Sequence, residues 1–316
     1  MALIAIGIIG AGIVGERIIK QIQQNDVAQI KAVYDTNVDR LNFIEQQYGI
    51  PVTNSLDELF QADIDWVYIG TPPNSHAELA ETAARRGLHI LCEKPLAHDA
   101  QAAQAMAESA TNNRVHTAMH FPLMYSPIVR DMAIRIKSGD IGKIRRIELH
   151  TVFPVWPRTW QQNPWIGSRD QGGFVREVFP HYLQLMHRLF GTLEIAAHQA
   201  DFPEDTGKCE TGLIAHGKTQ QGSPFLLSGM SGAGQTELLQ FKVYGEDGVL
   251  TLENWSRLYR EEQGKTRVEV QTETIVPSLF EEMEEQSTFL VGFDEGLVVQ
   301  RYIDQLLQEP TGGNQS

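Results

Sequence analysis

A glycine-rich turn stands almost at the first residue of the chain. An apolar run over residues 2–9 predicts a buried strand, and Gly10, Gly12 and Gly15 follow it at the head of a helix-like stretch that ends near residue 24. In such a unit the first glycine permits a tight turn, the second lets the backbone approach a pyrophosphate, and the third lets the helix pack on the strand. Unpaired N–H groups at the start of the helix then bind phosphate. The opening residues therefore predict a dinucleotide-binding unit.

An acidic residue ends the next predicted strand. Residues 30–34 are apolar, and Asp35 follows them, 20 residues after the last of these glycines. A carboxylate in this place accepts hydrogen bonds from both ribose hydroxyls and repels a 2′-phosphate. The next two residues are not basic, and we expect Arg40, one helical turn further on, to be solvated. The pattern predicts NAD as the cofactor, with NADP the less favoured alternative.

Length and charge limit the possible classes of function. The 316 residues are enough for two domains that each bury a core, and 42% hydrophobic with 21% charged residues is typical of a globular protein. A net charge of −14 argues against binding to nucleic acid or to a membrane surface, because both favour basic proteins. No apolar run approaches the roughly 20 residues of a membrane span, and the N-terminus lacks the basic region of a signal peptide. We expect a cytoplasmic protein.

The cysteines do not indicate a disulfide framework. Cys92 and Cys209 lie far apart in the chain, and Cys92 ends an apolar run, where it is expected to be inert packing. The chain also lacks the clustered His, Cys and Asp spacing of a metal site, so no metal is expected.

The first 120 residues alternate between predicted strands and helices. After the two strands already described, three more apolar runs are separated by amphipathic stretches. This alternation predicts a doubly wound parallel sheet of the Rossmann type, covered by helices on both faces. The predicted strands are 65–69, 88–92 and 115–120, and the predicted helices are 37–48, a short one capped at 55–58, 74–86 and 98–112.

The pattern changes after Phe121, where strand-like runs begin to dominate. Their alternation of apolar and polar residues suits an antiparallel sheet with one covered face. Residues 121–316 are therefore predicted to form an α+β domain with an open, mainly antiparallel sheet. The predicted strands are 143–153, 192–200, 211–216, 224–229, 237–244, 249–253 and 266–274. The predicted helices are 126–138 and 174–190, residues 283–308 are predicted to be mostly helix, and residues 311–316 are expected to be frayed.

Two motifs follow predicted strands of the first domain. Thr71, Pro72, Pro73, Asn74 and His76 come after the strand at 65–69, and Glu93, Lys94 and Pro95 come after the strand at 88–92. Loops that follow parallel strands lie at the carboxyl edge of the sheet, where open α/β folds bind ligands. The simplest interpretation of the first motif is the capped start of a helix, and the second, by itself, could be a surface turn.

Taken together, the motifs resemble the Gfo/Idh/MocA family of sugar and polyol oxidoreductases. The resemblance rests on the GxGxxG turn, the acid after the second strand, Thr-Pro-Pro-Asn-x-His-Ala and Cys-Glu-Lys-Pro. It implies an NAD-binding domain at 1–120 and a substrate-binding and oligomerisation domain at 121–316. The residues that it implies for cofactor binding are Gly10, Gly12, Ile13, Val14, Gly15, Asp35, Thr71, Pro72, Asn74, His76, Glu93 and Lys94.

The resemblance also implies a catalytic lysine. In that family the lysine of Glu-Lys-Pro lies beside the nicotinamide and the reacting carbon, and here this residue is Lys94. An ammonium group stabilises a developing alkoxide and eases the loss of the hydroxyl proton. Glu93 is expected to orient Lys94 or to pair with it, and Pro95 often follows a cis peptide bond in the family.

The family's second catalytic element is an aspartate four residues before a histidine, on a helix after a Gly-Gly turn. Here Gly172 and Gly173 precede Glu177 and His181, so glutamate replaces the usual aspartate. Residues i and i+4 share one helical face, and His181 is the natural general base. Three roles are open for Glu177. It orients His181, contacts the substrate, or pairs with Arg176 or Lys94. Pro180 predicts a kink just before His181.

A segment rich in aromatic residues allows two interpretations. Rigid indoles cover the apolar face of a sugar ring, and arginines clamp carboxylates or phosphates, which would make this segment part of a substrate pocket. The segment could equally be a packed loop or a subunit contact. His120, at the end of the strand predicted at 115–120, lines the pocket or serves as a hinge. The residues of the segment are Phe153, Trp156, Arg158, Trp160, Trp165 and Arg169.

These observations predict a two-domain dehydrogenase with its active site in the cleft between the domains. Hydride transfer would connect nicotinamide with a secondary alcohol or ketone of a sugar, a polyol or a related cyclic compound, with His181 taking the hydroxyl proton and Lys94 stabilising the oxyanion. The alternatives are a non-catalytic dinucleotide-binding sensor, an NAD-dependent glycoside hydrolase, and a reductase of dihydrodiols or other carbonyls. The uncovered face of the second sheet predicts a homodimer or homotetramer.

Overall fold

The computed structural model describes residues 3–161 and 163–308, and it divides into two compact units. One unit comprises Met1–Phe121 and Pro277–Gln300, and the other comprises Pro122–Val276 and Arg301–Ser316. The division after residue 121 lies where the sequence pattern changes, but residues 277–300 group with the first unit rather than with 121–276. The tail predicted to fray, residues 311–316, lies outside the described residues, as does the first residue of the strand predicted at 2–9.

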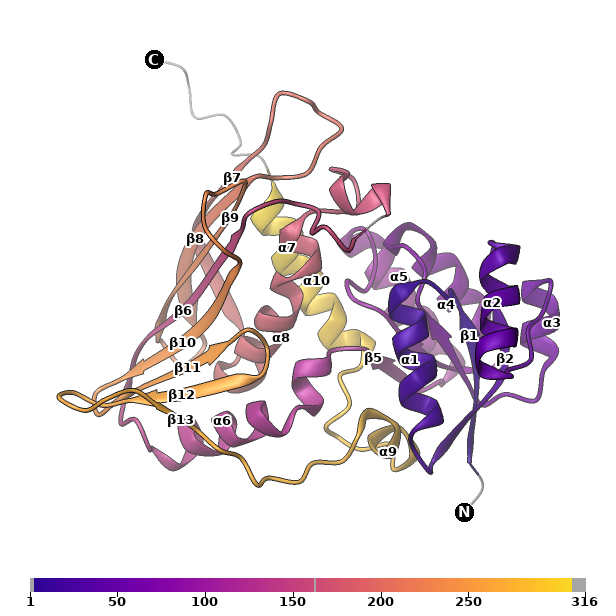
Figure 1. Cartoon of the computed structure of the whole chain (residues 1–316), viewed down its shortest axis with the longest axis horizontal. Coiled ribbons are helices and arrows are strands. Elements are labelled where there is room, and N and C mark those ends of the chain that lie inside the picture. The colour runs from indigo at the N-terminus through magenta and orange to yellow at the C-terminus, as the bar shows by residue number, and fades with distance from the viewer. Residues whose placement is uncertain (1–2, 162, 309–316) are drawn as a thin grey trace. The chain divides into compact units, whose positions relative to one another are not determined.

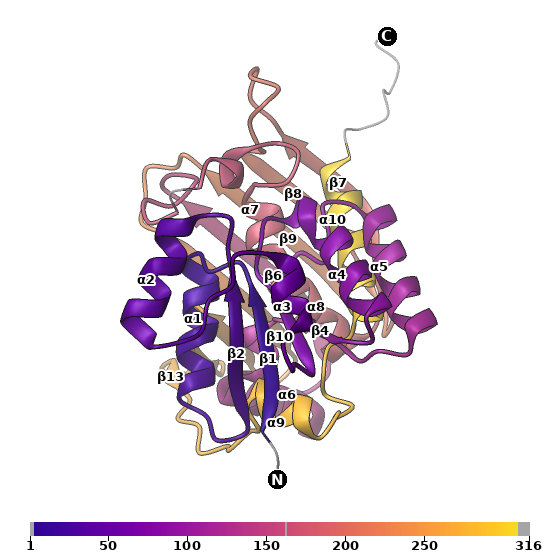
Figure 2. The same cartoon turned by 90° about the vertical axis from the view of Figure 1, so that its right-hand side faces the viewer.

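A five-stranded parallel sheet forms the core of the first unit. Its order, β2-β1-β3-β4-β5, places β1 at the point where the direction of winding reverses (Figure 2). Every residue of β1 and β3 is buried, as expected for a sheet that is covered on both faces. The predicted doubly wound sheet is confirmed. The strands are β1 Ile4–Ile9, β2 Ala28–Tyr34, β3 Trp66–Ile69, β4 His89–Cys92 and β5 Thr117–Met119.

Helices connect these strands and lie on both faces of the sheet. α1 lies on one face and α4 and α5 on the other, as right-handed crossovers require (Figure 2). The side chains of Asn37, Ser55 and Asp99 cap three of the helices. Each accepts the backbone N–H of the residue three positions later. The helices are α1 Ile13–Gln23, α2 Val38–Tyr48, α3 Leu56–Gln61, α4 His76–Arg85, preceded by the 3₁₀ turn η1 Pro73–Ser75, and α5 Ala100–Asn113.

Residues 283–308, predicted to be mostly helix, contain the end of α9 Leu279–Glu284 and all of α10 Phe293–Leu307. Between the two helices the chain runs beside the edge strand β5 of the parallel sheet. The backbone N–H of Met119 donates to Val291 O at 2.7 Å, and Phe293 N–H donates to Thr117 Oγ1 at 3.0 Å. The helical pattern is interrupted here because these residues satisfy the open edge of β5.

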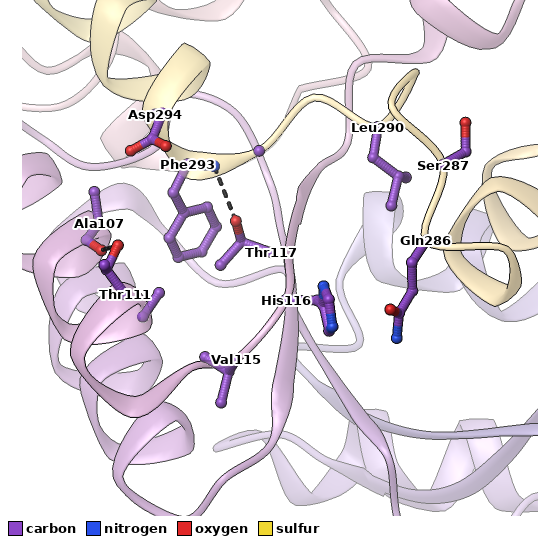
Figure 3. Close-up of a pocket in the computed structure, with 12 residues that line it drawn as sticks. Ala107, Thr111, Val115, His116, Thr117, Gln286, Ser287, Leu290, Phe293 and Asp294 are labelled. Atoms are coloured by element: carbon purple, nitrogen blue, oxygen red, sulfur yellow. Dashed lines mark hydrogen bonds between the residues drawn. The ribbon is translucent and has the colours of Figure 1, made fainter.

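A pocket of about 300 Å³ lies between α5, the start of β5 and this segment (Figure 3). Phe293 and Thr117 lie side by side in its lining, joined by the hydrogen bond from Phe293 N–H to Thr117 Oγ1, and Thr111, His116 and Leu290 line it as well. Thr117 is the first residue of β5, whereas the motifs predicted to bind the cofactor follow the last residues of their strands. The pocket therefore lies toward the amino end of its strand, whereas the candidate site lies at the carboxyl ends of the strands.

The second unit contains an eight-stranded sheet in the order β13-β12-β11-β10-β6-β9-β8-β7. Its neighbours pair antiparallel except for β6 and β9, which are parallel. The predicted mainly antiparallel sheet is confirmed. The strands are β6 Ile144–Phe153, β7 Leu193–Asp201, β8 Gly212–Thr219, β9 Pro224–Ser231, β10 Leu238–Gly245, β11 Val249–Glu253, β12 Arg257–Glu261 and β13 Val268–Glu269.

Helices of the second unit cover one face of this sheet (Figure 1). They are α6 Pro127–Ser138, α7 Phe174–Glu177 and α8 Phe179–Phe190. Buried and exposed residues alternate along β8 and β9, and the opposite face exposes Ile214 and Met230. The second sheet is therefore open on one face, as its alternation predicted.

Two elements of the second unit differ from the prediction. β12 was not predicted, and of the strand predicted at 266–274 only Val268–Glu269 pairs. The helix predicted at 174–190 is divided at Val178, so that Pro180 stands in the first turn of α8. A proline there loses no helical hydrogen bond, and the predicted kink is instead a break between two helices. No helix in the described part of the chain is long and apolar enough to cross a membrane.

Candidate functional site

The glycine turn after β1 has room for a ligand at one position only. Gly10 has φ +93°, and a Cβ on it would lie 2.7 Å from Gly70 O, so the turns that follow β1 and β3 touch. A Cβ on Gly15 would lie 2.1 Å from Gly10 O, because α1 packs directly on this turn. A Cβ on Gly12 would meet nothing within 4 Å. Gly10 and Gly15 are therefore required for packing, and Gly12 leaves the backbone open to a bound group.

The start of α1 suits a pyrophosphate. Gly12 is its N-cap and offers no side chain to the first N–H groups of the helix. Ile13, the next residue, is 42% exposed although it is apolar. A helix of this length presents unpaired N–H groups and a positive dipole end to an anion. The residues at this position thus fit the dinucleotide that the sequence predicted.

Asp35 is held rigidly at the end of β2. Its Oδ2 accepts the N–H of Ala11 at 2.7 Å, and its Oδ1 accepts the N–H of Asn37 at 2.8 Å. Arg40 is not solvated, which corrects the prediction. It donates from Nε to Ala11 O and from Nη2 to Glu16, and its side chain is 25% exposed. Arg40, on α2, is therefore held against the glycine turn, because Glu16 on α1 attracts its guanidinium.

Glu93, which follows β4, is the centre of a buried hydrogen-bond network. Its Oε1 accepts the Tyr68 hydroxyl at 2.9 Å and lies 2.5 Å from His120 Nδ1. Burial by itself raises the pKa of Glu93, but the interactions with His120, with the Lys94 charge and with Tyr68 outweigh it and lower the pKa to about 2. Glu93 is therefore ionised and faces polar groups from β3 and from the end of β5.

Glu93 was expected to orient or pair with Lys94, and that role stays a prediction. The Lys94 backbone N–H donates to Glu93 Oε2 at 3.3 Å, and the Lys94 charge helps to lower the pKa of Glu93. The Lys94 side chain is half-buried, and the Lys94–Pro95 peptide is cis. Tyr68 was not predicted at all, although a tyrosine inside a fully buried strand is a signal, since its hydroxyl needs a partner. A pocket or hinge role of His120 stays a prediction.

His76, predicted to contact the cofactor, is fully buried. Its Nε2 lies 2.8 Å from Thr71 O, and its Nδ1 lies 3.1 Å from Leu96 O and 3.2 Å from Pro95 O. The imidazole thus joins the loop after β3 to the loop after β4. Its position indicates that it holds Thr71 and Pro95 in place, and direct contact with a cofactor stays a prediction.

In the second unit, His181 contacts an aromatic pair. Its ring packs edge-on against Trp255 with 5.1 Å between ring centres, and Tyr182 stacks on Trp255 with 5.3 Å between ring centres. Trp255 has φ +72° and its neighbour Asn254 has φ +47°. A bulky residue in this conformation is uncommon and often marks a functional site. Trp255 was not predicted as a site residue, and its signal in the sequence is a tryptophan in the turn between β11 and β12.

Glu177 and His181 do not lie on one continuous helix as predicted. Glu177 is the last residue of α7 and His181 the third of α8, with Val178 between the helices. Arg176, one candidate partner of Glu177, donates from Nη1 to Arg169 O at 3.1 Å and Gly172 O at 3.3 Å. The role of Glu177 stays open among the three alternatives.

A buried acid holds the turn that begins α7. Glu210 is 1% exposed, its Oε1 accepts the N–H of Val175 at 2.7 Å, and a Cβ on Gly173 would lie 2.2 Å from its Oε2. Burial raises the pKa of Glu210 to about 7, against the opposing effects of the Val175 N–H and of the Arg176 charge. Glu210, which was not predicted as a site residue, therefore requires glycine at position 173, whereas glycine at 172 is required by the carbonyl groups of Trp165 and Ile166.

Glu210→Gln is expected to change how stability depends on pH. Because the folded-state pKa lies above that of the unfolded chain, near 4.3, Glu210 costs stability as pH rises from about 4.5 through 7. At about 1.4 kcal/mol per pKa unit this amounts to about 3 kcal/mol, which the glutamine variant does not lose. Urea unfolding of the wild type and of Glu210→Gln at pH 5 and at pH 8 measures this loss. If the free energy of unfolding changed equally with pH in the two proteins, the assignment to Glu210 would be contradicted.

Some residues of the aromatic segment are packed and others are exposed. Trp156 donates from Nε1 to Ile166 O at 3.2 Å and packs on Phe153, and Arg158 bonds both oxygens of Glu237 at 2.9 and 3.0 Å. These contacts favour the packed-loop interpretation for Trp156 and Arg158. Trp160 is 45% exposed. A substrate role stays a prediction for Trp160, for half-buried Trp165 and for Arg169, whose guanidinium lies over Phe202.

Both cysteines are buried thiols. Burial raises the pKa of Cys209 to about 12 and that of Cys92 well above its usual value. Thiols of this kind are poor nucleophiles, which agrees with the packing role expected for Cys92. Within residues 3–161 and 163–308 no group of three or more His, Cys, Asp or Glu side chains is arranged to hold a metal ion.

Two family descriptions match the chain. The first, an oxidoreductase family with an NAD-binding Rossmann fold, matches residues 4–121, and the second, a GFO/IDH/MocA C-terminal domain, matches residues 129–251. The chain belongs to the Gfo/Idh/MocA family. The resemblance that the N-terminal motifs carried is confirmed, and the first unit is an NAD-binding Rossmann domain of this family.

Curated relatives within the family are named as oxidoreductases. The chain is 31% identical over 186 residues to inositol 2-dehydrogenase of Rhizobium meliloti, which covers 58% of this chain and 54% of the relative. It is 30% identical over 190 residues to an uncharacterised oxidoreductase of Streptococcus pneumoniae serotype 4, which covers 60% of this chain and 51% of that protein. The chain thus spans about half the length of the curated relatives that it matches.

Solved structures share the fold over nearly the whole chain. Levoglucosan dehydrogenase in complex with NADH has a TM-score of 0.82 at 18% identity, covering 97% of this chain and 96% of that one. An oxidoreductase of Agrobacterium radiobacter, in complex with NAD⁺, L-tartaric acid and magnesium, has a TM-score of 0.82 at 17% identity, covering 96% and 95%. At these identities the likeness concerns the fold.

Proposed function

We propose that the chain is an NAD-dependent oxidoreductase that acts on a secondary alcohol or ketone of a sugar, a polyol or a related cyclic compound. The observation that carries this proposal is the position of Lys94. It directly follows the ionised, buried Glu93 at the carboxyl edge of the parallel sheet, the same edge at which the open Gly12 turn leaves β1. Bound NAD⁺ supplies the hydride acceptor at this edge.

The proposed roles of the chain's own residues follow from their chemistry. The Lys94 ammonium stabilises the negative charge that develops on the substrate oxygen as its proton leaves. The imidazole of His181 accepts that proton, because its usual pKa lies near neutral pH. Lys94 belongs to the first unit and His181 to the second, so the proposal requires both to act on one substrate. Trp255, beside His181, offers an indole of the kind that covers sugar rings.

The names of relatives support a substrate with several hydroxyl groups. Besides the inositol 2-dehydrogenase, the chain is 29% identical over 189 residues to glucose-6-phosphate 3-dehydrogenase of Bacillus subtilis and 26% identical over 188 residues to a D-apiose dehydrogenase of Paraburkholderia graminis. These proteins act on different sugars and polyols by name. The proposal is therefore limited to the class of substrate and leaves the individual compound to be measured.

The test is a screen for NAD⁺ reduction with sugars, inositols, sugar acids and dihydrodiols, followed by absorbance at the NADH band. Turnover with at least one polyol or sugar supports the proposal. Turnover with dihydrodiols alone would move the substrate class to non-sugar alcohols. Tight NADH binding without turnover on any compound would favour the rival function, a non-catalytic dinucleotide sensor with the same fold.

We also propose that the open face of the eight-stranded sheet joins two copies of the chain. Ile214 and Met230 are exposed on neighbouring strands, and an apolar sheet face of this kind is commonly covered by another protein surface. Light scattering at micromolar concentration distinguishes a dimer or tetramer from a monomer, and a monomer would contradict this part.

A further inference from the structure

A charged network surrounds the adenosine end of the proposed cofactor site. Glu16, in the first turn of α1, bonds the Tyr48 hydroxyl at 2.6 Å, Lys20 Nζ at 2.8 Å and a guanidinium nitrogen of Arg40. The Arg40 guanidinium also lies 4.8 Å from the centre of the Phe43 ring. Glu16 thus fixes an arginine that comes from the next helix, α2.

The backbone of Ala11 connects this arginine to the acid that ends β2. The Ala11 N–H donates to Asp35 Oδ2 at 2.7 Å, and its carbonyl accepts Arg40 Nε. One residue of the glycine turn therefore holds Asp35 on one side and Arg40 on the other. A ribose that hydrogen-bonds Asp35 would bring its 2′ position into the region that these two side chains share.

Glu16 keeps its charge at all physiological pH values. Burial by itself raises the pKa of Glu16, but the hydrogen bonds from Lys20, Tyr48 and Arg40 lower it to about 2. Its carboxylate thus neutralises the nearby guanidinium. Lys20 also pairs with Glu16 at 2.8 Å, but its side chain is 53% exposed and so more strongly screened by solvent than that of Arg40, which is 25% exposed.

We propose that Glu16 determines the choice of cofactor by neutralising Arg40, so that this arginine does not bind the 2′-phosphate of NADP. The inference rests on the proposed binding of NAD. Asp35 repels a 2′-phosphate directly, and Glu16 excludes it indirectly by occupying the Arg40 guanidinium, a group that can bind a phosphate in a bidentate manner. Discrimination against NADP thus has two layers, of which the sequence pattern indicated only the first.

The two layers predict a specific pattern in binding. Removing Asp35 alone relieves the repulsion but leaves Arg40 paired with Glu16. Removing Glu16 alone releases Arg40 but leaves the repulsion by Asp35. The gain in NADPH affinity is therefore expected mainly when both acids are neutralised, and it must depend on Arg40.

The experiment is a titration of the purified full chain with NADH and with NADPH, followed by the fluorescence of the reduced nicotinamide. The proteins are the wild type, D35N, E16Q, D35N/E16Q and D35N/E16Q/R40A, with circular dichroism to establish that each is folded. The wild type should bind NADH at least about tenfold more tightly than NADPH. D35N/E16Q should bind NADPH about tenfold more tightly than D35N, a gain that falls with added salt and disappears with R40A.

The matched control is Tyr48→Phe in the D35N background. It removes one hydrogen bond from Glu16 but leaves the charge that neutralises Arg40, so NADPH binding should match that of D35N. The inference is overturned if D35N/E16Q binds NADPH no more tightly than D35N, or if the gain survives R40A. A wild type that binds neither cofactor contradicts the proposed function itself, whereas tight NADH binding without the NADPH gain contradicts this inference alone.

Discussion

Lys94→Ala is expected to lower kcat by about 100- to 1,000-fold on any substrate found by the screen, while the dissociation constant for NADH changes by less than about threefold. Removal of one preorganised group that stabilises a developing oxyanion has an effect of this size. The ground-state cofactor keeps its contacts with the glycine turn, so its binding should persist. Steady-state kinetics and a fluorescence titration with NADH measure the two quantities separately.

A double variant tests whether Lys94 and His181 serve the same step. His181→Ala should also lower kcat by at least about 100-fold, as for the loss of a general base. If both groups act on one reacting carbon, Lys94→Ala/His181→Ala should cost much less than the product of the single effects. Lys94→Arg is the matched control, since it keeps the charge. Full activity in both single variants would remove the catalytic assignment.

Glu93→Ala is expected to destabilise the fold by about 3–5 kcal/mol, the cost of removing the charged centre of a buried hydrogen-bond network. The substitution leaves the buried Tyr68 hydroxyl and the His120 imidazole without their carboxylate. Urea unfolding at pH 7, followed by circular dichroism, measures the change. Tyr68→Phe is the matched control, because it removes one hydrogen bond and should cost about 1 kcal/mol.

The same network predicts that the free energy of unfolding decreases at acid pH. Because the folded-state pKa of Glu93 is lowered to about 2, its contribution is present above the unfolded value, near 4.3, and is lost as pH falls from about 4.5 toward 2. Glu93→Gln should lack this part of the loss. If Glu93→Ala were no less stable than Tyr68→Phe, the carboxylate would not be the centre of the network.

The features that could be predicted from the sequence are those with local causes. Gly10 is favoured by its own positive φ and Gly15 by its contact with Gly10 O, and the side chains of Asn37 and Asp99 each cap the backbone N–H of the residue three positions later. For this reason the turn, the alternation of strands and helices and the loops that carry Lys94 and His76 were predicted close to where they lie. The family resemblance rests on these same local motifs.

The errors concern pairings between distant parts of the chain. The interruption of the helical segment 283–308 was not predicted, because nothing local shows that Val291 meets the edge of β5, and β12 carries charged residues that hid its strand pattern. Arg40 was expected in solvent, because its attraction to Glu16 crosses from α2 to α1. A charged side chain's partner depends on the packing of elements, which sequence spacing does not contain.

The amino-acid sequence by itself determined the nucleotide-binding unit, the edge of the sheet at which chemistry is expected and the candidates Lys94 and His181. Only the tertiary structure decided what surrounds them. Glu93 takes its partners from β3 and from the end of β5, 25 and 27 residues away, and Trp255 reaches His181 from a turn between two strands. Backbone turns follow from the conformational freedom of single residues, whereas the partners of buried charges and rings follow from which strands and helices become neighbours.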